Sequence, residues 1–174
     1  IEDITATLDD ILALARIGHA GGEGEAVDLA ALAGAVEEEF EDLGAPVELD
    51  LPDGAPRIVA RVRETWARRA LRNLVSNALR YGGGAKVTVA QRSADGDPVA
   101  VLAVDDEGPG IPQDRIEAMM QPFARGEGSR NRATGGAGLG LTLARAVAEA
   151  EGGRLVLENR EAGGLRAELR FPSG

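Results

Sequence analysis

Hydrophobic residues recur along the chain with helical spacing in some segments and with alternating spacing in others. Residues 1–18 place apolar or small side chains three and four positions apart, which is the spacing of a coiled-coil seam. We expect this helix to pack in a bundle or dimer, with a helix lying on its own domain as the alternative. Residues 19–27 are polar and glycine-rich and predict a linker. The seam residues are Ile1, Ile4, Leu8, Ile11, Ala15 and Gly18.

Residues 28–174 alternate helical and strand-like segments and predict a single α+β domain. Asp28 is a typical N-cap for a helix that uses apolar residues as far as Leu43. Glycines at 82–84 end a long helix over 61–81. Further helices are expected near 113–120 and over 139–150, and strands at 47–51, near 58–59, and at 86–92, 99–104, 154–159 and 166–171. We expect a two-layer sandwich, in which helices cover one face of a mixed, mostly antiparallel sheet and leave the other face relatively open.

Composition and charge narrow the classes of function. The chain has 174 residues, 44% of them hydrophobic, which suits one folded domain with an appendage. Its formal net charge of −10 argues against a nucleic-acid backbone or an anionic membrane as the main partner. The absence of cysteine excludes disulfides, thiolate metal sites and a cysteine nucleophile. No apolar run approaches the roughly 20 residues of a membrane-spanning helix. The chain starts in mid-pattern, so we expect a piece of a longer protein that can carry a membrane anchor elsewhere.

The long helix over 61–81 carries polar residues on one face. Asn73, Asn77 and Arg80 are spaced i, i+4 and i+7, so their side chains share that face. Asparagine is a mediocre helix former, and two at this spacing need a reason. A solvated polar face is one explanation. The other is an amide oxygen that binds Mg²⁺, a cation that prefers hard oxygen ligands and usually shares them with phosphates.

An acidic, glycine-rich turn follows the apolar strand at 99–104. Residues 105–112 read DDEGPGIP. An acidic side chain at a strand end can accept a hydrogen bond from an exocyclic amine, and Gly108 and Gly110 would let the backbone approach a flat ring closely. An ordinary acidic Pro-Gly turn is the alternative.

A second glycine-rich segment, GGAGLGL at 135–141, opens the helix over 139–150. Backbone N–H groups without partners and the helix dipole attract phosphate at such a start. The segment is not a P-loop, which needs a Gly-Lys-Ser/Thr ending, because the only lysine in the chain is Lys86. It is not a dinucleotide fingerprint either, because its glycines alternate and do not follow a first strand.

The asparagine helix, the Asp-x-Gly-x-Gly turn and the Gly-x-Gly-x-Gly loop occur in this order along the chain. Together they resemble the catalytic, ATP-binding domain of bacterial sensor histidine kinases, within the superfamily that includes gyrase, Hsp90 and MutL. The resemblance covers nearly the whole chain. In its details the sequence resembles the EnvZ-like branch of these kinases. It assigns an N box to 73–81, a G1 box to 105–112, an F box to 121–126 and a G2 box to 135–141.

The resemblance also implies a fold and a domain division. The fold is the Bergerat-type ATP-binding sandwich. Residues 1–18 would be the second helix of a dimerisation and phosphotransfer domain, residues 19–27 the linker, and residues 28–174 the catalytic domain.

Roles for individual residues follow from the same resemblance. Asn77 would bind Mg²⁺, and Asn73 would support the phosphates and the metal. Arg80 and Tyr81 would lie along the phosphates and the nucleoside. Asp106, two residues before the first glycine of the turn, would accept a hydrogen bond from the adenine amino group.

Residues 121–137 would form a lid over the nucleotide. In it, Phe123 and Arg125 would sense the γ-phosphate or contact the partner domain, and Arg130 could do likewise. The expected catalytic set is Asn73, Asn77, Arg80 and Arg125. The other residues expected to line the nucleotide site are Gly108, Gly110, Ile111, Gly136, Gly138, Leu139, Gly140 and Leu141.

One position separates a kinase from a hydrolase. ATPases of the superfamily, such as gyrase, place a glutamate four residues before the metal-binding asparagine, where it activates water. Here that residue is Asn73, so no general base is expected there and the bound ATP is kept for transfer to a side chain. The phosphoacceptor histidine of the family is missing. The only histidine, His19, lies in the linker, and we interpret it as a solvated residue.

We therefore expect a domain that binds ATP and Mg²⁺ and transfers the γ-phosphoryl group to a histidine on its own dimerisation domain, in a full-length homodimer. An aspartate of a response-regulator receiver domain would be the later acceptor. No nucleic-acid partner and no membrane contact by this part of the protein are expected. The expected location is cytoplasmic, including the cytoplasmic part of an inner-membrane protein. Two alternatives stay open: a serine kinase or ATPase of the same superfamily, and a non-catalytic nucleotide-sensing module.

Overall fold

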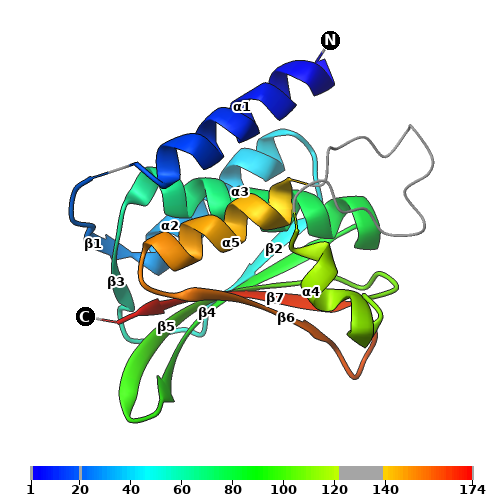
Figure 1. Ribbon diagram of the computed structural model, residues 1–174. Coiled ribbons are helices and arrows are strands. Elements are labelled where there is room, and N and C mark those ends of the chain that lie inside the picture. The colour runs from blue at the N-terminus through cyan, green and yellow to red at the C-terminus, as the bar shows by residue number, and fades with distance from the viewer. Residues whose placement is uncertain (1, 20, 122–138, 174) are drawn as a thin grey trace.

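The structure, a computed structural model, describes residues 2–19, 21–121 and 139–173, with side chains described from residue 4 onward. Apart from β1, which the sequence did not predict, its elements follow one another as the helical and strand patterns predict (Figure 1). The described helical elements are α1 (Glu2–Ile17), α2 (Leu29–Asp42), α3 (Glu64–Gly82), the 3-10 helix η1 (Gln113–Arg115), α4 (Ile116–Met119) and α5 (Gly140–Ala150). The strands are β1 (Glu25–Asp28), β2 (Val47–Asp50), β3 (Val59–Val62), β4 (Ala85–Ala94), β5 (Asp97–Asp105), β6 (Arg154–Asn159) and β7 (Leu165–Pro172).

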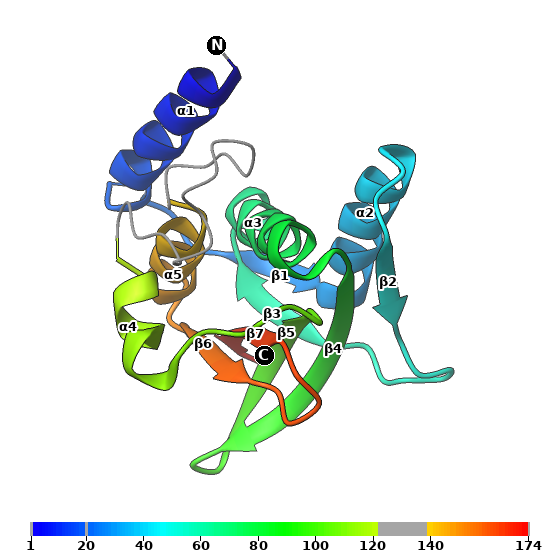
Figure 2. The same ribbon diagram turned by 90° about the vertical axis from the view of Figure 1, so that its right-hand side faces the viewer.

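Five strands form the main sheet, in the order β2-β4-β5-β7-β6. β2 pairs with β4 in parallel, and the other three pairings are antiparallel. Helices α2, α3 and α5 lie on one side of this sheet (Figure 2). The expectation of an α+β sandwich with a mixed, mostly antiparallel sheet is therefore confirmed. The Asp28 cap is confirmed as well, because its Oδ1 accepts hydrogen bonds from the N–H groups of Ala30 and Ala31 at 3.0 and 3.3 Å.

Two predicted boundaries were wrong. Residues 25–27, expected in the linker, belong to β1, which pairs antiparallel with β3 in a separate two-stranded sheet. Of these three residues only Val27 is buried, so the strand leaves almost no hydrophobic pattern in the sequence. The long helix begins at Glu64 and not at 61, because β3 extends to Val62.

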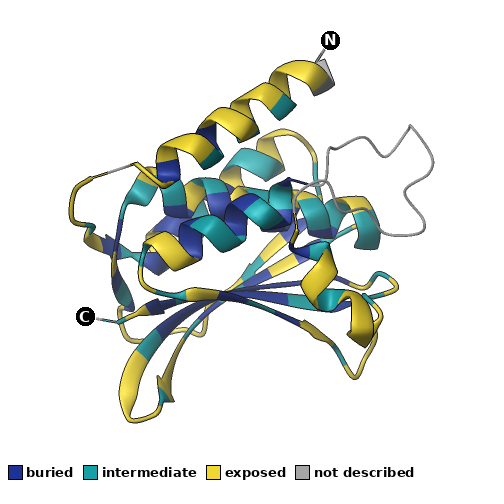
Figure 3. Ribbon diagram, viewed as in Figure 1, coloured by how far each residue is buried: buried dark blue, intermediate teal, exposed yellow. Residues whose placement is uncertain are grey.

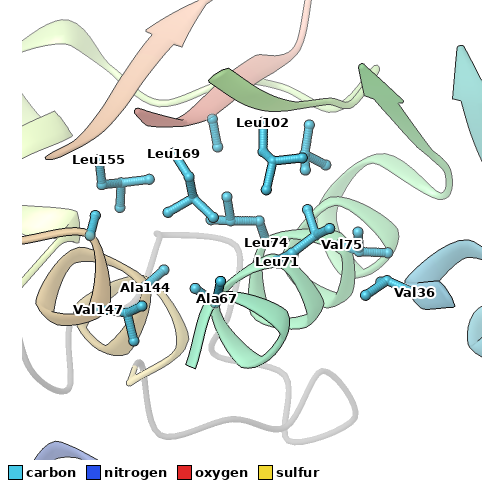
Figure 4. Close-up of a cluster of buried hydrophobic side chains, with 14 of the residues drawn as sticks. Val36, Ala67, Leu71, Leu74, Val75, Leu102, Ala144, Val147, Leu155 and Leu169 are labelled. Carbon is cyan, nitrogen blue, oxygen red and sulfur yellow. The ribbon is translucent and has the colours of Figure 1, made fainter. Parts of the chain in front are cut away.

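The core lies between the helices and the sheet (Figures 3 and 4). Leu71, Leu74 and Val75 of α3 are each at most 1% exposed. They face Leu102 of β5 and Leu169 of β7 (Figure 4). Burying such a side chain stabilises the fold by about 1.5–3 kcal/mol. Within the described ranges, no helix combines the length and apolarity that crossing a membrane requires.

A row of charged residues crosses the sheet on the side away from the helices. The strand pairings place Glu48, Lys86, Asp105, Arg166 and Glu158 opposite one another, one from each strand in sheet order. The charges alternate in sign along the row. Two carboxylate–cation contacts in it measure 4.0 Å (Lys86 Nζ to Glu48 Oε1) and 2.6 Å (Arg166 Nη2 to Asp105 Oδ2). Because opposite charges directly across a strand pair are favourable and like charges are not, the row supports this register over its neighbours.

A buried carboxylate lies further along the same face. Glu168 of β7 is 2% exposed, and its carboxylate lies 2.9 Å from Arg92 Nη1 and 2.7 Å from Arg170 Nη2. In the strand pairing, Glu168 stands opposite Ala103 and Arg170 stands opposite Val101. Val101 and Ala103 are themselves only 1% and 3% exposed, although they do not belong to the core under the helices. Long charged side chains therefore cover the apolar residues on this face of the sheet.

Helix α1 lies over α5, on the side of the helix layer away from the sheet (Figures 1 and 2). Ala13 and Ile17 are buried as part of the main core. Asp10 Oδ1 accepts a hydrogen bond from Arg69 Nη2 of α3 at 3.0 Å. One face of the helix therefore packs against the helix layer, while the described residues of the predicted seam, from Ile4 to Gly18, are exposed. The large apolar residues that α1 exposes are Ile4, Leu8, Ile11 and Leu12, at 43% to 68%.

An ion pair joins the start of α3 to the end of α5. Glu151, the C-cap residue of α5, accepts hydrogen bonds from the backbone N–H of Arg63 at 3.2 Å and from its Nε at 2.7 Å. Arg63 is the N-cap of α3. The Glu151 side chain is 5% exposed. The pair therefore satisfies a backbone donor at one helix start and fixes the two helices side by side.

Replacing Glu151 should destabilise the fold. In Glu151→Ala, Arg63 loses the two hydrogen bonds that its backbone N–H and its Nε donate to Glu151, and we expect the free energy of unfolding to fall by about 1–3 kcal/mol. Glu149→Ala is the matched control, because it removes an exposed i, i+4 partner of Arg145 on the same helix and should cost less than about 0.5 kcal/mol. Urea denaturation measures both. Equal losses in the two variants would show that Glu151 acts only as a surface charge.

Candidate functional site

The polar face of α3 borders the start of α5. Asn73 is half-buried, and among the residues that the structure describes its Nδ2 is the one buried side-chain nitrogen or oxygen without a hydrogen-bond partner. A Cβ on Gly140, the first residue of α5, would lie 4.0 Å from the Cβ of Asn73. Asn77 is half-buried and Arg80 is exposed on the same face. An amide donor without a partner therefore lies beside a helix N-terminus.

The first turn of α5 has no side-chain cap. Leu139 is its N-cap, and no described side chain bonds to the N–H groups of the first turn. Leu139 and Leu141 are buried, at 2% and 6% exposed, so both anchor this end of the helix in the core. Free N–H groups and the helix dipole make such a start a favourable site for an anion. Of the predicted phosphate loop, Gly136 and Gly138 lie outside the described residues.

Asp106 lies at the end of β5 and is held by backbone groups. It is 5% exposed. Its Oδ1 accepts hydrogen bonds from the N–H groups of Gly108 at 2.8 Å and Leu165 at 3.1 Å. Its own N–H donates to the carbonyl of Leu165 at 3.0 Å. Because both side-chain bonds use Oδ1, Oδ2 is the carboxylate oxygen left for a ligand.

The end of α3 packs closely against the 105–112 turn. A Cβ on Gly82 would lie 2.7 Å from the Cβ of Asp106 and 3.0 Å from the backbone nitrogen of Gly108. A Cβ on Gly108 would in turn lie 2.7 Å from the carbonyl oxygen of Tyr81. Only glycine fits at either position without moving a backbone. The close approach brings the half-buried Tyr81 and the Asp106 carboxylate into one region.

The neighbouring aspartate has a different environment. Asp105 accepts two hydrogen bonds from Arg166, at 2.7 Å from Nε and 2.6 Å from Nη2. These hydrogen bonds raise the pKa of Arg166 above its ordinary value. Such a bidentate pair is geometrically specific. It engages Asp105 on the far face of the sheet, so of the two aspartates Asp106 is the one available to a ligand.

The β6–β7 turn supplies contacts that the sequence patterns did not reveal. Arg160 Nη1 donates to the carbonyl of Asp106 at 2.6 Å. The Asn159 amide forms two hydrogen bonds with the backbone of Ile111. Another contact without a sequence signal joins α5 to the residue after α4: Thr142 Oγ1 donates a hydrogen bond to the carbonyl of Met120 at 2.9 Å. Single polar residues carry no periodic signal, so no pattern could have found them.

The predicted lid falls largely outside the described residues. This holds for Phe123, Arg125 and Arg130, and their roles stay predictions. The described site therefore consists of the polar face of α3, the turn at 105–112 and the start of α5. It combines a buried carboxylate at a strand end with neutral amides and helix N–H groups, which suits a ligand with an amine-bearing ring at one end and an anionic group at the other.

The sequence of the chain matches a known protein family and several of its members. Residues 62–174 match the family described as histidine kinase-, DNA gyrase B- and HSP90-like ATPase. The sensor histidine kinase GtrS of Pseudomonas aeruginosa is 39% identical over 132 residues, which are 70% of this chain and 25% of that protein. The signal transduction histidine-protein kinase BaeS of Escherichia coli is 32% identical over 178 residues, covering 97% of this chain and 37% of that protein. The matched regions thus span only between a quarter and just over a third of the length of these two relatives.

Solved structures show the same fold. The full-length structure of ShkA in complex with AMPPNP has a TM-score of 0.74 and 26% identity, covering 99% of this chain and 36% of that chain. The histidine kinase domain of the Escherichia coli osmosensor EnvZ has a TM-score of 0.64 and 31% identity, covering 89% and 92% of the two chains. The chain therefore belongs to the histidine kinase-, gyrase B- and Hsp90-like ATPase family, as the ATP-binding catalytic domain of a two-component sensor histidine kinase.

Adding one methyl group at Gly82 should disturb the site from the helix side. In an ordinary helix, Gly→Ala is stabilising by up to about 1 kcal/mol. In Gly82→Ala the new Cβ has no room against Asp106, so we expect a loss of about 1–3 kcal/mol in the free energy of unfolding. Gly84→Ala is the control, because its Cβ would lie at an ordinary 3.5 Å from the carbonyl of Pro46. Chemical denaturation measures the free energy of unfolding of both variants. A Gly82→Ala variant more stable than the wild type would contradict the close packing of Gly82 against Asp106.

Proposed function

We propose that Mg²⁺-bound ATP occupies the space between α3, the 105–112 turn and the start of α5, and that its γ-phosphoryl group passes to a histidine on a dimerisation domain. The single observation that carries the proposal is the buried Nδ2 of Asn73, which lacks a partner and lies beside the uncapped first turn of α5. A buried amide donor without a partner costs free energy unless a ligand accepts its hydrogen bond. A phosphate at the helix start would do so.

Asp106 would select the base. Its Oδ1 is occupied by the N–H groups of Gly108 and Leu165, which leaves Oδ2 to accept a hydrogen bond from an exocyclic amine. Adenine presents such a donor, whereas the corresponding position of guanine is a carbonyl that would face the carboxylate. The closely packed backbone of Gly82 and Gly108 forms one wall of this region.

Asn77 and Arg80 would serve the phosphate end. Asn77 follows Asn73 by one helical turn and offers a neutral amide oxygen, the kind of donor that Mg²⁺ accepts alongside phosphate oxygens. Bound there, Mg²⁺ would neutralise charge on the phosphates. Arg80 lies one turn further on and would add a positive charge near the phosphates. The backbone N–H groups of Leu141 and its neighbours would donate hydrogen bonds to the phosphate oxygens. The proposed lid residues Phe123 and Arg125 would exclude water.

The chemistry is an in-line displacement at the γ-phosphorus. A histidine nitrogen forms the new P–N bond, and the bond to the bridging oxygen breaks and releases ADP. Asn73 occupies the position where hydrolytic relatives place a glutamate, and an amide cannot take a proton from water. The domain would therefore accelerate the transfer by positioning the reactants and neutralising charge on the phosphates. The product is phosphohistidine because a histidine, and not water, is placed to attack.

The acceptor belongs to another part of the protein. His19 lies just beyond the end of α1 and is exposed, and its Nδ1 lies 3.0 Å from the carbonyl oxygen of Ala15 in the helix. This environment suits a solvated residue after a helix end. We assign residues 1–18 to the second helix of the dimerisation domain, because α1 exposes its apolar seam. The full-length protein would then be a homodimer that passes the phosphoryl group to a receiver-domain aspartate, with this domain on the cytoplasmic side.

Two substitutions test the ATP site. Asn77→Ala removes the proposed metal donor, and Asp106→Asn replaces the acceptor that faces the base with an amide. We expect each to weaken the affinity for AMPPNP with Mg²⁺ by at least about tenfold, since a charge-assisted hydrogen bond or a metal contact is worth about 1.5–3 kcal/mol. Isothermal titration calorimetry measures the affinity. Unchanged affinity in both variants would contradict the assignment of the site.

Transfer is tested by mixing this chain with a histidine-bearing dimerisation domain and labelled ATP. The label should appear on that domain and disappear in acid, because a phosphorus–nitrogen bond is acid-labile. Label that survives acid would indicate a serine kinase of the same superfamily. Binding without any label would favour a nucleotide-sensing module.

A further inference from the structure

A side-chain amide at the end of β6 bonds to both backbone groups of one residue in the 105–112 turn. Asn159 Oδ1 accepts a hydrogen bond from the N–H of Ile111 at 2.9 Å. Its Nδ2 donates to the carbonyl oxygen of Ile111 at 2.6 Å. The side-chain amide thus satisfies both the N–H and the carbonyl of Ile111, as the backbone of a neighbouring β-strand would do.

Gly110 is enclosed by the same contacts. It has a φ of +73°, in the left-handed region that favours glycine. A Cβ there would collide with Asn159 Oδ1 and lie 3.4 Å from the carbonyl oxygen of Gly164. The turn therefore lies directly against the β6–β7 connection at Gly110 and Ile111.

The other end of the turn is anchored separately. Asp106 is bonded to the backbone of Leu165 in both directions, at the start of β7. Between the two anchored ends the turn contains two glycines and an exposed Pro109. A short, glycine-containing segment loses much conformational freedom on ordering, so its conformation depends on what holds its ends.

We propose that Asn159 is a positioning residue for the nucleotide, which holds Gly110 and Ile111 in the arrangement that the adenosine part of the ligand requires. The proposal rests on the proposed function. Among the described contacts, the side-chain hydrogen bonds of Asn159 go to the backbone of Ile111 and not to Asn73 or Asn77 at the proposed phosphate end. If the turn leaves the competent conformation for part of the time, the apparent affinity falls in proportion to the lost fraction.

The variant Asn159→Ala removes both hydrogen bonds and is tested by calorimetry with AMPPNP and with ADP, each with and without Mg²⁺. We expect both affinities to fall by the same factor, about threefold to tenfold, the effect of losing one or two exposed hydrogen bonds. The gain in affinity on adding Mg²⁺ should stay as in the wild type.

Glu161→Ala is the matched control, because Glu161 is exposed in the same β6–β7 connection and its loss should leave both affinities unchanged. Amide hydrogen exchange without nucleotide gives a second measurement: the Ile111 N–H should exchange faster in Asn159→Ala than in the wild type or in Glu161→Ala. Thermal unfolding checks that all variants fold.

Three outcomes would overturn the proposal. Faster exchange at Ile111 with wild-type affinities would show that the turn does not limit binding. Unequal losses for AMPPNP and ADP would place the effect at the phosphates. A wild-type protein that binds neither nucleotide would remove the proposed function itself, and this is seen before any variant is compared.

Discussion

The pairing of β5 with β7 is the constraint on which the site depends. It places Asp105 opposite Arg166 on the face away from the helices. Because side chains alternate between the faces of a sheet, the next residue points to the other side just as the strand ends. That residue is Asp106, and the backbone of Leu165 in β7 then holds its carboxylate. If the strand slipped by one residue, every side chain would change faces. Asp105 would then point to the ligand side and lose its pairing with Arg166, and Asp106 would point to the face away from the helices.

The packing of α3 against α5 supplies the second half of the site. At one end of the helix pair, Glu151 bonds to Arg63 across a short distance. At the other end, the small Gly140 lies against Asn73. A polar contact at one end and a glycine at the other together place the polar face of α3 beside the first turn of α5. The proposed phosphate region is therefore a product of helix packing more than of any one loop.

The elements of the fold could be predicted from the sequence because their hydrophobic periods are strong. The helix after Asp28 and the run of strands on either side of Gly96 are examples, and the order of three weak motifs was enough to indicate the family. The register of the sheet was not accessible in this way, since it depends on which charged residues meet across the strands. β1 was missed because a strand with one buried side chain, Val27, has no alternation to detect.

The candidate site divides along the same line. Residues that repeat along a helix face, such as Asn73 and Asn77, stood out from their spacing. Asn159, at the end of β6, and Arg160, in the turn that follows, did not stand out. Each is an isolated polar residue whose hydrogen-bond partner lies about fifty residues away in the chain. Glu151 also gave no signal, although it joins two helices. Isolated polar contacts of this kind need coordinates, since neither propensity nor periodicity distinguishes them from solvated surface residues.

The charged face of the sheet has a consequence for how such a domain associates. Glu168, Arg92 and Arg170 cover Val101 and Ala103 with side chains of the domain itself. Helices thus cover one face of the sheet and ion-paired side chains cover the other, so the sheet needs no further layer. Its exposed large apolar residues are concentrated on α1, on the helix side. A partner that binds through apolar contacts would therefore find its surface on α1, whereas the ion-paired face of the sheet offers it mainly charged side chains.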